Sequence, residues 1–380
     1  MQKLFIFQTF CIAEQSQFIF SLSSKHDIII HMKTKVYKID RDHIDTDKIK
    51  EAADTIRVGG LAAFPTETVY GLGADAMNPD ASRKIYAAKG RPSDNPLIVH
   101  ISRWEDLEKI AREIPDRAKK LADAFWPGPL TMILNKKEQV PKETTGGLDT
   151  VAVRMPKDEI ALALIEESGC LIAAPSANTS GRPSPTLAEH VLKDLNGRIP
   201  LILDGGEVGI GIESTIIDLT EGIPVILRPG RITNEMLNKV IGEVTIDPGL
   251  ISEDSGVKPK APGMKYRHYA PKAGLVLVEG EEENVIAKIN ALTEELQKHE
   301  KKVGIIGTDE TVSRYLGDYV ISIGARKDEE GIARHLYRIL RDFDELGVEM
   351  IYSESFSSQG IGQAIMNRLL KAAGHQILEV

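Results

Sequence analysis

One stretch of the sequence, residues 60–101, constrains the fold more than any other. Leu61–Phe64 is a short apolar run that predicts a buried strand. A helix is expected between Asn78, a typical N-cap residue that proline follows, and Gly90, a typical helix-ending residue. Leu97–Ile101 predicts the next strand. A strand, a helix and a strand in such close succession indicate an α/β protein.

Polar and charged side chains gather at the ends of these predicted elements. Five of them, in chain order, are Thr68, Lys89, Arg91, Asn95 and His100. Each alone is more often structural, because a lone lysine is usually a surface residue and a lone buried histidine usually has a protein partner. Together they offer a hydroxyl, two cations, an amide and an imidazole where α/β proteins place their binding sites. The stretch is therefore a candidate site.

Further predicted elements follow at uneven intervals up to residue 247. Some neighbouring strands are joined without a helix, which favours a mixed sheet over strict strand–helix–strand repetition. Ser102–Glu105 and Thr186–Glu189 have the spacing of a capping box and predict the starts of two helices. Other helices are expected at 45–58, 115–125 and 158–168, and strands at 35–39, 130–134, 150–155, 170–174, 201–203, 214–219 and 225–227.

The composition changes twice beyond this region. Residues 248–272 are rich in proline, glycine and serine, which is typical of an extended linker. From 273 to 380, apolar runs alternate with helical patterns and predict a smaller parallel α/β domain. Gly304 and Gly307 lack the GxGxxG spacing, so we expect no dinucleotide site there. We call 33–247 the first domain and 273–380 the C-terminal domain.

Composition excludes several classes of protein. The net charge is −9, so contact with nucleic acid would need a local basic patch. The two cysteines, Cys11 and Cys170, have neither a disulfide framework nor metal-finger spacing, and we expect a reducing, cytoplasmic setting. The GxxxxGK[ST] motif is absent, which excludes the P-loop route to ATP.

Several basic and short polar residues could bind phosphate. A phosphate site needs fixed cations and hydrogen-bond donors where charge accumulates. Ser176 and Asn178 follow an apolar strand, although a Pro-Ser-Ala-Asn turn alone is better explained as a turn without a ligand. The candidate cations are Lys89, Arg91, Arg154, Arg228 and Arg231.

Nine blocks of sequence, in order, resemble the YrdC/Sua5 family, the threonylcarbamoyl-AMP synthases. The last two of them are similar to the longer Sua5 branch, which adds a linker and a second domain. Lys89-x-Arg91 together with Ser176-x-Asn178 resembles the family's KxR…SxN signature. The blocks are FPTETVYGLGADA, KGRPSDNPLIVHI, WPGPLT, VAVRMP, APSANTSGRPSPT, ESTIID, LRPG, KYRHYAP and GQAIMNRLLKAA.

The resemblance implies a fold and a set of roles. It implies a YrdC-like twisted mixed sheet with helices and a Rossmann-like C-terminal domain. It implies catalytic roles for Lys89, Arg91, Ser176 and Asn178. The ATP contacts that it implies are Arg91, Asn95, Thr150, Ser176, Ser184, Arg228, Tyr266, Arg267 and Tyr269. The L-threonine contacts that it implies are Thr68, His100, Arg154, Ala174 and Ser214.

The resemblance also implies substrates and partners. L-threonine, bicarbonate and ATP would give threonylcarbamoyl-AMP and pyrophosphate, with Mg²⁺ carried on the ATP phosphates and no dedicated protein ligands for the metal. The product would pass to a complex that modifies adenosine 37 of tRNAs reading ANN codons. A further candidate partner is tRNA or double-stranded RNA, in direct contact, and no contact with a membrane is expected.

Two alternatives stay open at this point. The chain could be a non-enzymatic double-stranded RNA-binding or ribosome maturation factor, which would bind RNA without nucleotide turnover. It could also be a carbamoyl-adenylate-forming domain like that of hydrogenase maturation, although the zinc-finger-like cysteines and acylphosphatase segment of that protein are missing. Within the linker, Tyr266, Arg267 and Tyr269 are expected to close over the nucleotide as a lid, while the simpler alternative is a tether.

Residues 1–32 lie outside the resemblance. Their apolar runs, 4–7 and 18–20, are separated by polar residues, so the segment is a poor signal peptide and too short and polar for a membrane span. Met32 opens MKTKVYKID, where family members are expected to start. We interpret 1–32 as the product of an over-called start codon, and an intact mass that includes Met1 would contradict this.

Overall fold

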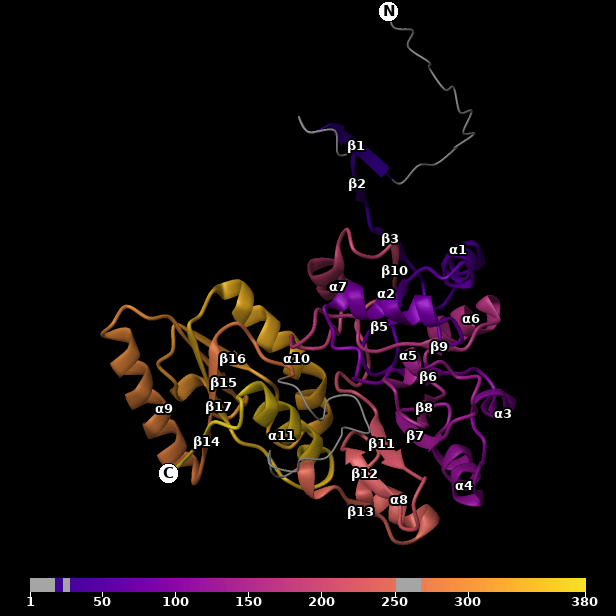
Figure 1. The fold of residues 1–380 in the computed structure, drawn as a ribbon. Helices are drawn as coiled ribbons and strands as arrows, with labels where there is room; N and C mark the ends of the chain where they lie inside the picture. The colour runs from indigo at the N-terminus through magenta and orange to yellow at the C-terminus, as the bar shows by residue number, and fades with distance from the viewer. Residues whose placement is uncertain (1–17, 23–27, 251–267) are drawn as a thin grey trace, which may run out of the picture.

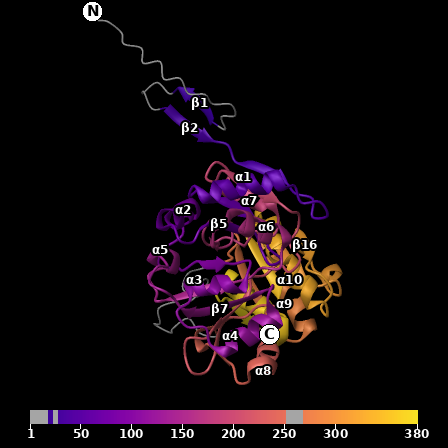
Figure 2. The ribbon, with the colours of Figure 1, turned by 90° about the vertical axis from the view of Figure 1, so that its right-hand side faces the viewer.

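The computed structural model describes residues 18–22, 28–250 and 268–380. In Figure 1 the first domain, coloured purple to pink, lies beside the orange and yellow C-terminal domain. β1 (Phe18–Leu22) and β2 (Ile28–Met32) form a separate antiparallel pair, which Figure 2 shows projecting away from both domains. No helix in the described ranges is long and apolar enough to span a membrane.

The first domain is built on an eleven-stranded mixed sheet with the order β13-β12-β11-β7-β8-β6-β9-β5-β4-β10-β3. β6, for example, pairs in parallel with β8 and antiparallel with β9, which confirms the mixed sheet that the uneven spacing predicted. The strands are β3 (Lys35–Lys38), β4 (Ala62–Phe64), β5 (Gly71–Asp75), β6 (Ile98–His100), β7 (Leu130–Asn135), β8 (Thr150–Arg154), β9 (Ile172–Ala173), β10 (Leu201–Asp204), β11 (Thr215–Asp218), β12 (Val225–Arg228) and β13 (Thr245–Ile246).

The helix of the opening stretch forms where its end signals predicted. The side-chain oxygen of Asn78 accepts hydrogen bonds from the backbone N–H groups of Asp80 and Ala81, at 3.0 and 3.2 Å. Gly90 ends the helix in the left-handed conformation that favours glycine, with φ 62°. The helices of the first domain are α1 (Thr46–Arg57), α2 (Pro79–Lys89), α3 (Leu107–Ile110), α4 (Asp116–Phe125), α5 (Lys142–Thr145), α6 (Glu159–Ser168), α7 (Ala188–Leu195) and α8 (Asn234–Ile241).

Both predicted capping boxes are wrong. After Ser102 the chain makes a 3₁₀ turn at Trp104–Asp106 and only then the four-residue α3, with no side-chain cap at either start. α7 begins at Ala188, again without a side-chain cap. The backbone N–H of Thr186 donates instead to Nδ1 of His190 at 3.3 Å, and no described residue bonds the Thr186 hydroxyl. At Thr186 a contact with a residue outside the four-residue window therefore takes the place of the cap.

The C-terminal domain is a five-stranded parallel sheet with the order β16-β15-β17-β14-β18. Figure 1 shows α9 on its far side and α10 and α11 between the sheet and the first domain. β18 was not predicted, because it is a three-residue strand with exposed side chains and no buried face. The elements are β14 (Gly274–Glu279), α9 (Glu282–Gln297), β15 (Val303–Gly307), β16 (Tyr319–Ser322), α10 (Glu329–Leu346), β17 (Met350–Glu354), α11 (Gly360–Ala372) and β18 (Ile377–Glu379).

The two domains share a buried interface. Val69 and Ile212 of the first domain belong to the same apolar cluster as Leu336 and Tyr337 of α10. Beside this cluster, Arg341 of α10 makes an ion pair with Asp194 of α7, at 2.9 Å between Nη2 and Oδ2, and both side chains are almost fully buried. Apolar packing combined with a buried ion pair fixes the geometry more tightly than either alone, because the charges must stay paired.

Candidate functional site

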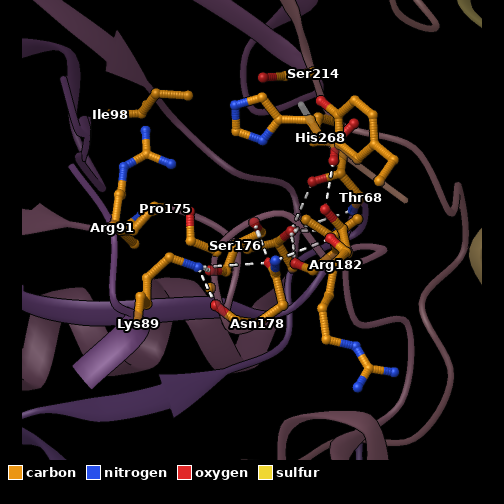
Figure 3. A pocket seen from close by; sticks show the side chains of 18 of the residues that line it. Thr68, Lys89, Arg91, Ile98, Pro175, Ser176, Asn178, Arg182, Ser214 and His268 are labelled. Atoms are coloured by element: carbon orange, nitrogen blue, oxygen red, sulfur yellow. Dashed lines mark hydrogen bonds between the residues drawn. The ribbon is translucent and has the colours of Figure 1, made fainter. Parts of the chain in front are cut away.

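A pocket opens at the strand ends of the first domain (Figure 3). Its walls come from the β4–β5 loop, the end of α2, strands β6 and β8, the loops that follow β9, and the ends of β11 and β12. His268 and Tyr269 close one side, and among the described residues none after Tyr269 lines it.

Lys89 holds the wall of the pocket in place. It ends α2 with only 2% of its surface exposed, and its ammonium donates to the backbone carbonyls of Ser176 and Asn178 (Figure 3). Burial lowers the pKa of this lysine well below its usual range. The predicted KxR…SxN pair is thus brought together, and here the lysine orders the turn that carries the serine and the asparagine.

The turn after β9 arranges its own polar groups. The hydroxyl of Ser176 donates to Oδ1 of Asn178 at 2.6 Å, and Nδ2 of Asn178 donates to the carbonyls of Thr179 and Arg182 at 2.7 and 3.0 Å. The backbone N–H of Ala177 donates to the carbonyl of Tyr70 at 2.8 Å, which ties the turn to the opening stretch of the chain. These bonds fix the Ser176 hydroxyl at the pocket wall.

Arg91 is a partly buried cation at the pocket. Its Nε and Nη2 donate to the carbonyls of Asn95 and Pro96, at 3.3 and 3.1 Å, and burial lowers the pKa of Arg91 to about 10. Figure 3 shows the guanidinium reaching past Pro175 toward Ile98. Because the group remains charged at neutral pH, it presents a fixed positive charge in a site of low dielectric constant.

The opposite wall presents hydroxyls and a second arginine. Thr68 shares a hydrogen bond of 2.8 Å with the hydroxyl of Thr66 and accepts one of 2.9 Å from Nη1 of Arg154. Nε of Arg154 donates to the carbonyl of Gly128 at 3.2 Å, and its Nη2 lies 2.7 Å from a carboxylate oxygen of Glu67. Nη1 of Arg154 carries one further N–H, and its Nη2 makes no hydrogen bond with the described residues. The guanidinium is therefore held in place and can still bind a carboxylate.

His100 lies between these walls as a neutral imidazole. Its Nδ1 is 3.2 Å from the carbonyl of Ile98, and the ring meets that of Phe64 edge-on at 6.3 Å. Burial, and then the charge of Arg154, lower the pKa of His100 to about 3. It can therefore exchange hydrogen bonds with a ligand at neutral pH without carrying a charge.

Ser214 and Arg228 form one unit at the ends of β11 and β12. Nε and Nη2 of Arg228 donate to the carbonyl and the hydroxyl of Ser214, at 3.0 and 3.1 Å. The Ser214 hydroxyl also shares a hydrogen bond of 2.8 Å with that of Thr131. All three side chains are buried. Arg228 is thus a third fixed arginine at the pocket, and its position depends on Ser214.

Glu213 is a pocket residue that the sequence did not single out. One oxygen of its carboxylate accepts from the Ser184 hydroxyl at 2.6 Å, and the other from Nε of Arg368 at 3.1 Å. Burial acts to raise the pKa of Glu213, but Arg368 and Arg228 outweigh it and lower the pKa to about 2. The block ESTIID contains this residue, yet its role depends on Arg368, 155 positions away, which no local pattern indicates.

The end of the linker also reaches the pocket. His268 was not among the predicted contacts, but it lines the cavity, and no described residue bonds its Nε2. Burial, and then the charge of Arg91, lower the pKa of His268 to about 3. Tyr269, with φ 66°, stacks on Tyr337 of α10 at a ring distance of 5.2 Å. Tyr266 and Arg267 lie outside the described residues.

Three candidates do not line the pocket. Thr150 begins β8 and pairs with Asn135, at the end of the strand away from Arg154. Asn95 is buried, and it is not among the residues that line the pocket. Its backbone carbonyl accepts a hydrogen bond from Arg91, which does line the pocket. Arg231, proposed as a phosphate cation, is half-exposed and makes an ion pair with Glu330 of α10 at 2.7 Å. The other candidates within the described residues, namely Thr68, Lys89, Arg91, His100, Arg154, Ala174, Ser176, Asn178, Ser184, Ser214, Arg228 and Tyr269, all line one cavity.

These features define a two-domain α/β protein with one polar, cationic pocket, and comparisons with known proteins give its family. Residues 54–230 match the Sua5/YciO/YrdC family model, described as "Telomere recombination", and residues 232–374 match "Threonylcarbamoyl-AMP synthase, C-terminal domain". The threonylcarbamoyl-AMP synthase of Pyrococcus abyssi is 53% identical over 340 residues, which cover 90% of this chain and 98% of that protein. That of Bacillus subtilis is 52% identical over 351 residues, 91% of this chain and 100% of that protein.

A solved structure agrees over the same length. The crystal structure of P. abyssi Sua5 complexed with L-threonine has a TM-score of 0.87 and 52% identity, and the match covers 91% of this chain and 100% of that one. This chain therefore belongs to the Sua5/YrdC family, as the nine sequence blocks indicated.

Proposed function

We propose that this chain makes threonylcarbamoyl-AMP from L-threonine, bicarbonate and ATP, with release of pyrophosphate. The observation that carries the proposal is a single pocket lined by the hydroxyls of Thr68 and Ser214 and by three arginines, Arg154, Arg91 and Arg228. Hydroxyls beside an arginine suit a small hydroxylated amino acid, and the further cations suit phosphate. Relatives named threonylcarbamoyl-AMP synthase match this chain over nearly their whole length.

The threonine end recognises its ligand by shape and by hydrogen bonds. Arg154 uses its remaining N–H groups to hold the carboxylate of the amino acid. The hydroxyls of Thr68 and Ser214 are available to the side chain of the substrate, and His100 contributes a neutral ring. Ala174, at the exit of β9, leaves room beside them because its side chain is a single methyl.

The nucleotide end supplies fixed charge and short donors. Arg91 and Arg228 neutralise the phosphates, and Ser176 and Ser184 add hydroxyls at the same wall. Mg²⁺ enters with ATP and is held mainly by the phosphate oxygens. Within the described residues, no three histidine, cysteine, aspartate or glutamate side chains gather as a protein-built metal site requires.

The chemistry needs positioning more than a protein nucleophile. The neutral threonine amine adds to CO₂, which bicarbonate releases together with hydroxide. The proton that the nitrogen loses combines with this hydroxide as water, which leaves a carbamate. A carbamate oxygen then attacks the α-phosphorus of ATP, and the bond to the β-phosphate oxygen breaks, so that pyrophosphate leaves. The protein brings the two reactants together and stabilises the negative charge at phosphorus through its arginines. The product supplies the threonylcarbamoyl group for adenosine 37 of tRNAs reading ANN codons, through a separate transfer complex.

One assay tests the reaction. Pyrophosphate release from ATP is measured with threonine and bicarbonate together and with each left out. We expect release to require both, and mass spectrometry to find threonylcarbamoyl-AMP. Pyrophosphate release that does not depend on threonine would contradict the proposal. RNA binding without any turnover would support the alternative of a non-enzymatic RNA-binding factor.

The linker protects the labile adenylate. Tyr269 already lines the pocket, and we assign a covering role to Tyr266 and Arg267 as well, with Arg267 meeting phosphate. Limited proteolysis between residues 250 and 272 should slow when ATP and threonine are added together. A cleavage rate that is the same with and without ligands would leave the linker as a tether.

A further inference from the structure

The carboxylate of Glu213 joins the pocket to the C-terminal domain. On the pocket side it accepts from the hydroxyl of Ser184 at 2.6 Å. On the other side the hydroxyl of Tyr337, from α10, donates to it at 2.9 Å, and Nε of Arg368, from α11, donates at 3.1 Å. Both oxygens are thus bonded, and Tyr337 and Arg368 are fully buried. A carboxylate held from two domains can occupy only one position while both stay bonded.

Arg368 also holds the backbone on both sides of the Ser214–Arg228 unit. Its Nη1 donates to the carbonyl of Pro229, the residue after Arg228, at 2.5 Å. Its Nη2 lies 3.4 Å from the carbonyl of Glu213, the residue before Ser214. One guanidinium from the C-terminal domain therefore anchors two neighbouring chain segments whose side chains face the ligand.

A second anchor supports the next segment of the wall. Arg341 lies four residues after Tyr337 on α10, so the two side chains share one face of the helix. Its Nη2 donates to the carbonyl of Pro183 at 2.6 Å and pairs with Asp194, which in turn accepts from the backbone N–H of Thr179 at 3.1 Å. The loop between the Ser176 turn and Ser184 is thus held from the same helix.

We propose that Arg368 and Tyr337 are positioning residues of the active site. Through Glu213 they set the Ser184 hydroxyl, and through the backbone of Glu213 and Pro229 they set Ser214 and Arg228. The C-terminal domain, none of whose described residues lines the pocket, thus completes its geometry. The inference rests on the proposed synthase activity, because the effect is read in the kinetics of that reaction.

The experiment compares stability with kinetics in matched variants. Arg368→Met leaves Glu213 as an unpaired buried charge, and the double variant Glu213→Gln/Arg368→Met removes that charge again. Arg326→Met is the control, since Arg326 pairs with the buried Glu354 inside the C-terminal domain. Steady-state pyrophosphate release gives kcat and KM for ATP and for threonine, and calorimetry gives Tm.

We expect Arg368→Met to lower kcat/KM at least tenfold, with higher KM values for both substrates. In the double variant Tm should recover while kcat/KM stays low, because the side chain at position 213 has lost one of its two anchors and the carbonyl of Pro229 has lost its donor. Arg326→Met should lower Tm and leave both KM values unchanged. Recovery of kcat/KM together with Tm in the double variant would reduce Arg368 to a structural residue and overturn the proposal.

Tyr337→Phe keeps the proposal testable if Arg368→Met does not fold. This change removes one hydroxyl and preserves the ring that stacks on Tyr269. We expect a three- to fivefold higher KM at nearly unchanged Tm, and an unchanged KM would contradict the role of Tyr337. A wild-type chain without threonine-dependent pyrophosphate release would instead refute the proposed function itself.

Discussion

The two sheets place very different structures at their strand ends. In the first domain the strand ends surround an open pocket lined by arginines and hydroxyls. In the C-terminal domain the chain continues from β15 to β16 and from the neighbouring β17 to β18, which lie toward opposite edges of the sheet. Parallel sheets commonly bind ligands at such a change of direction. There the carboxylate of Glu354 accepts from Tyr315 at 2.8 Å and pairs with Arg326. A closed ion pair occupies the position, so sheet topology alone does not identify a site.

The two domains contribute to the site in different ways. Residues that face the ligand come from the first domain and the end of the linker, whereas buried anchors behind them come from α10 and α11 of the C-terminal domain. If this division is correct, losing the anchors should damage catalysis even though no lining residue of the first domain is changed.

Removing the anchors altogether should have the largest effect. A chain ending at Asp247 keeps the apolar clusters of the first domain, so we expect it to fold. It lacks Tyr269, Tyr337 and Arg368, and we expect its threonine-dependent pyrophosphate release to fall at least about a hundredfold, near 2.7 kcal/mol. Circular dichroism checks the fold. A truncated chain as active as the full one would erase the division between the two domains.

Substrate selectivity tests the polar wall of the pocket. A site that hydrogen-bonds a substrate hydroxyl rejects an analogue without it, since its own buried groups then lose a partner. If Thr68 and Ser214 form that site, valine should bind at least about thirtyfold more weakly than threonine, near 2 kcal/mol, and serine should fall between them. Calorimetry measures all three. Equal affinities for valine and threonine would remove both residues from the substrate site.

Arg91 tests the cationic wall. We expect Arg91→Ala to lower turnover at least about tenfold, near 1.4 kcal/mol of transition-state stabilisation. Arg231→Ala is the matched control, because Arg231 is half-exposed and pairs with Glu330 away from the pocket. The measurement is the rate of pyrophosphate release by a folded Arg91→Ala chain. A rate like that of Arg231→Ala would refute the role of Arg91 in phosphate binding.

Lowering the pH should destabilise the first domain and the adjoining end of the linker, and we expect this effect to be smaller than those of the changes above. Burial lowers the pKa of His100, His190 and His268 to about 3, below the value near 6.5 of an unfolded histidine. Between pH 6.5 and 3 the unfolded chain binds more protons, so the free energy of unfolding falls as pH falls. The slope is at most about 1.4 kcal/mol per pH unit for each histidine.

Tryptophan fluorescence can follow this change in the first domain alone. Both tryptophans, Trp104 and Trp126, belong to that domain. The Tm that they report should be lower at pH 5 than at pH 7, and His190→Gln should reduce the difference. Identical Tm values at both pH values would contradict the lowered pKa values.

Local signals carried most of the prediction from sequence. The Asn78 cap, Gly90 and the apolar strands are read within a few residues, and the KxR…SxN residues follow strand and helix ends. Signals failed where distant contacts decide. Thr186 has the spacing of a capping box, yet its N–H bonds His190. Likewise, nothing near Glu213 shows that its charge is balanced by an arginine 155 positions later.

The ion pair between Glu213 and Arg368 also limits how such a protein can be rearranged by recombination. Consider a first domain joined to a foreign C-terminal domain that has an apolar residue in place of Arg368. Glu213 would then be an unpaired buried carboxylate, which lowers the free energy of unfolding by about 3–5 kcal/mol. An exchange that transfers only Glu213 or only Arg368 therefore destabilises the protein. Viable chimaeras should therefore be those in which the acid and the base are exchanged together.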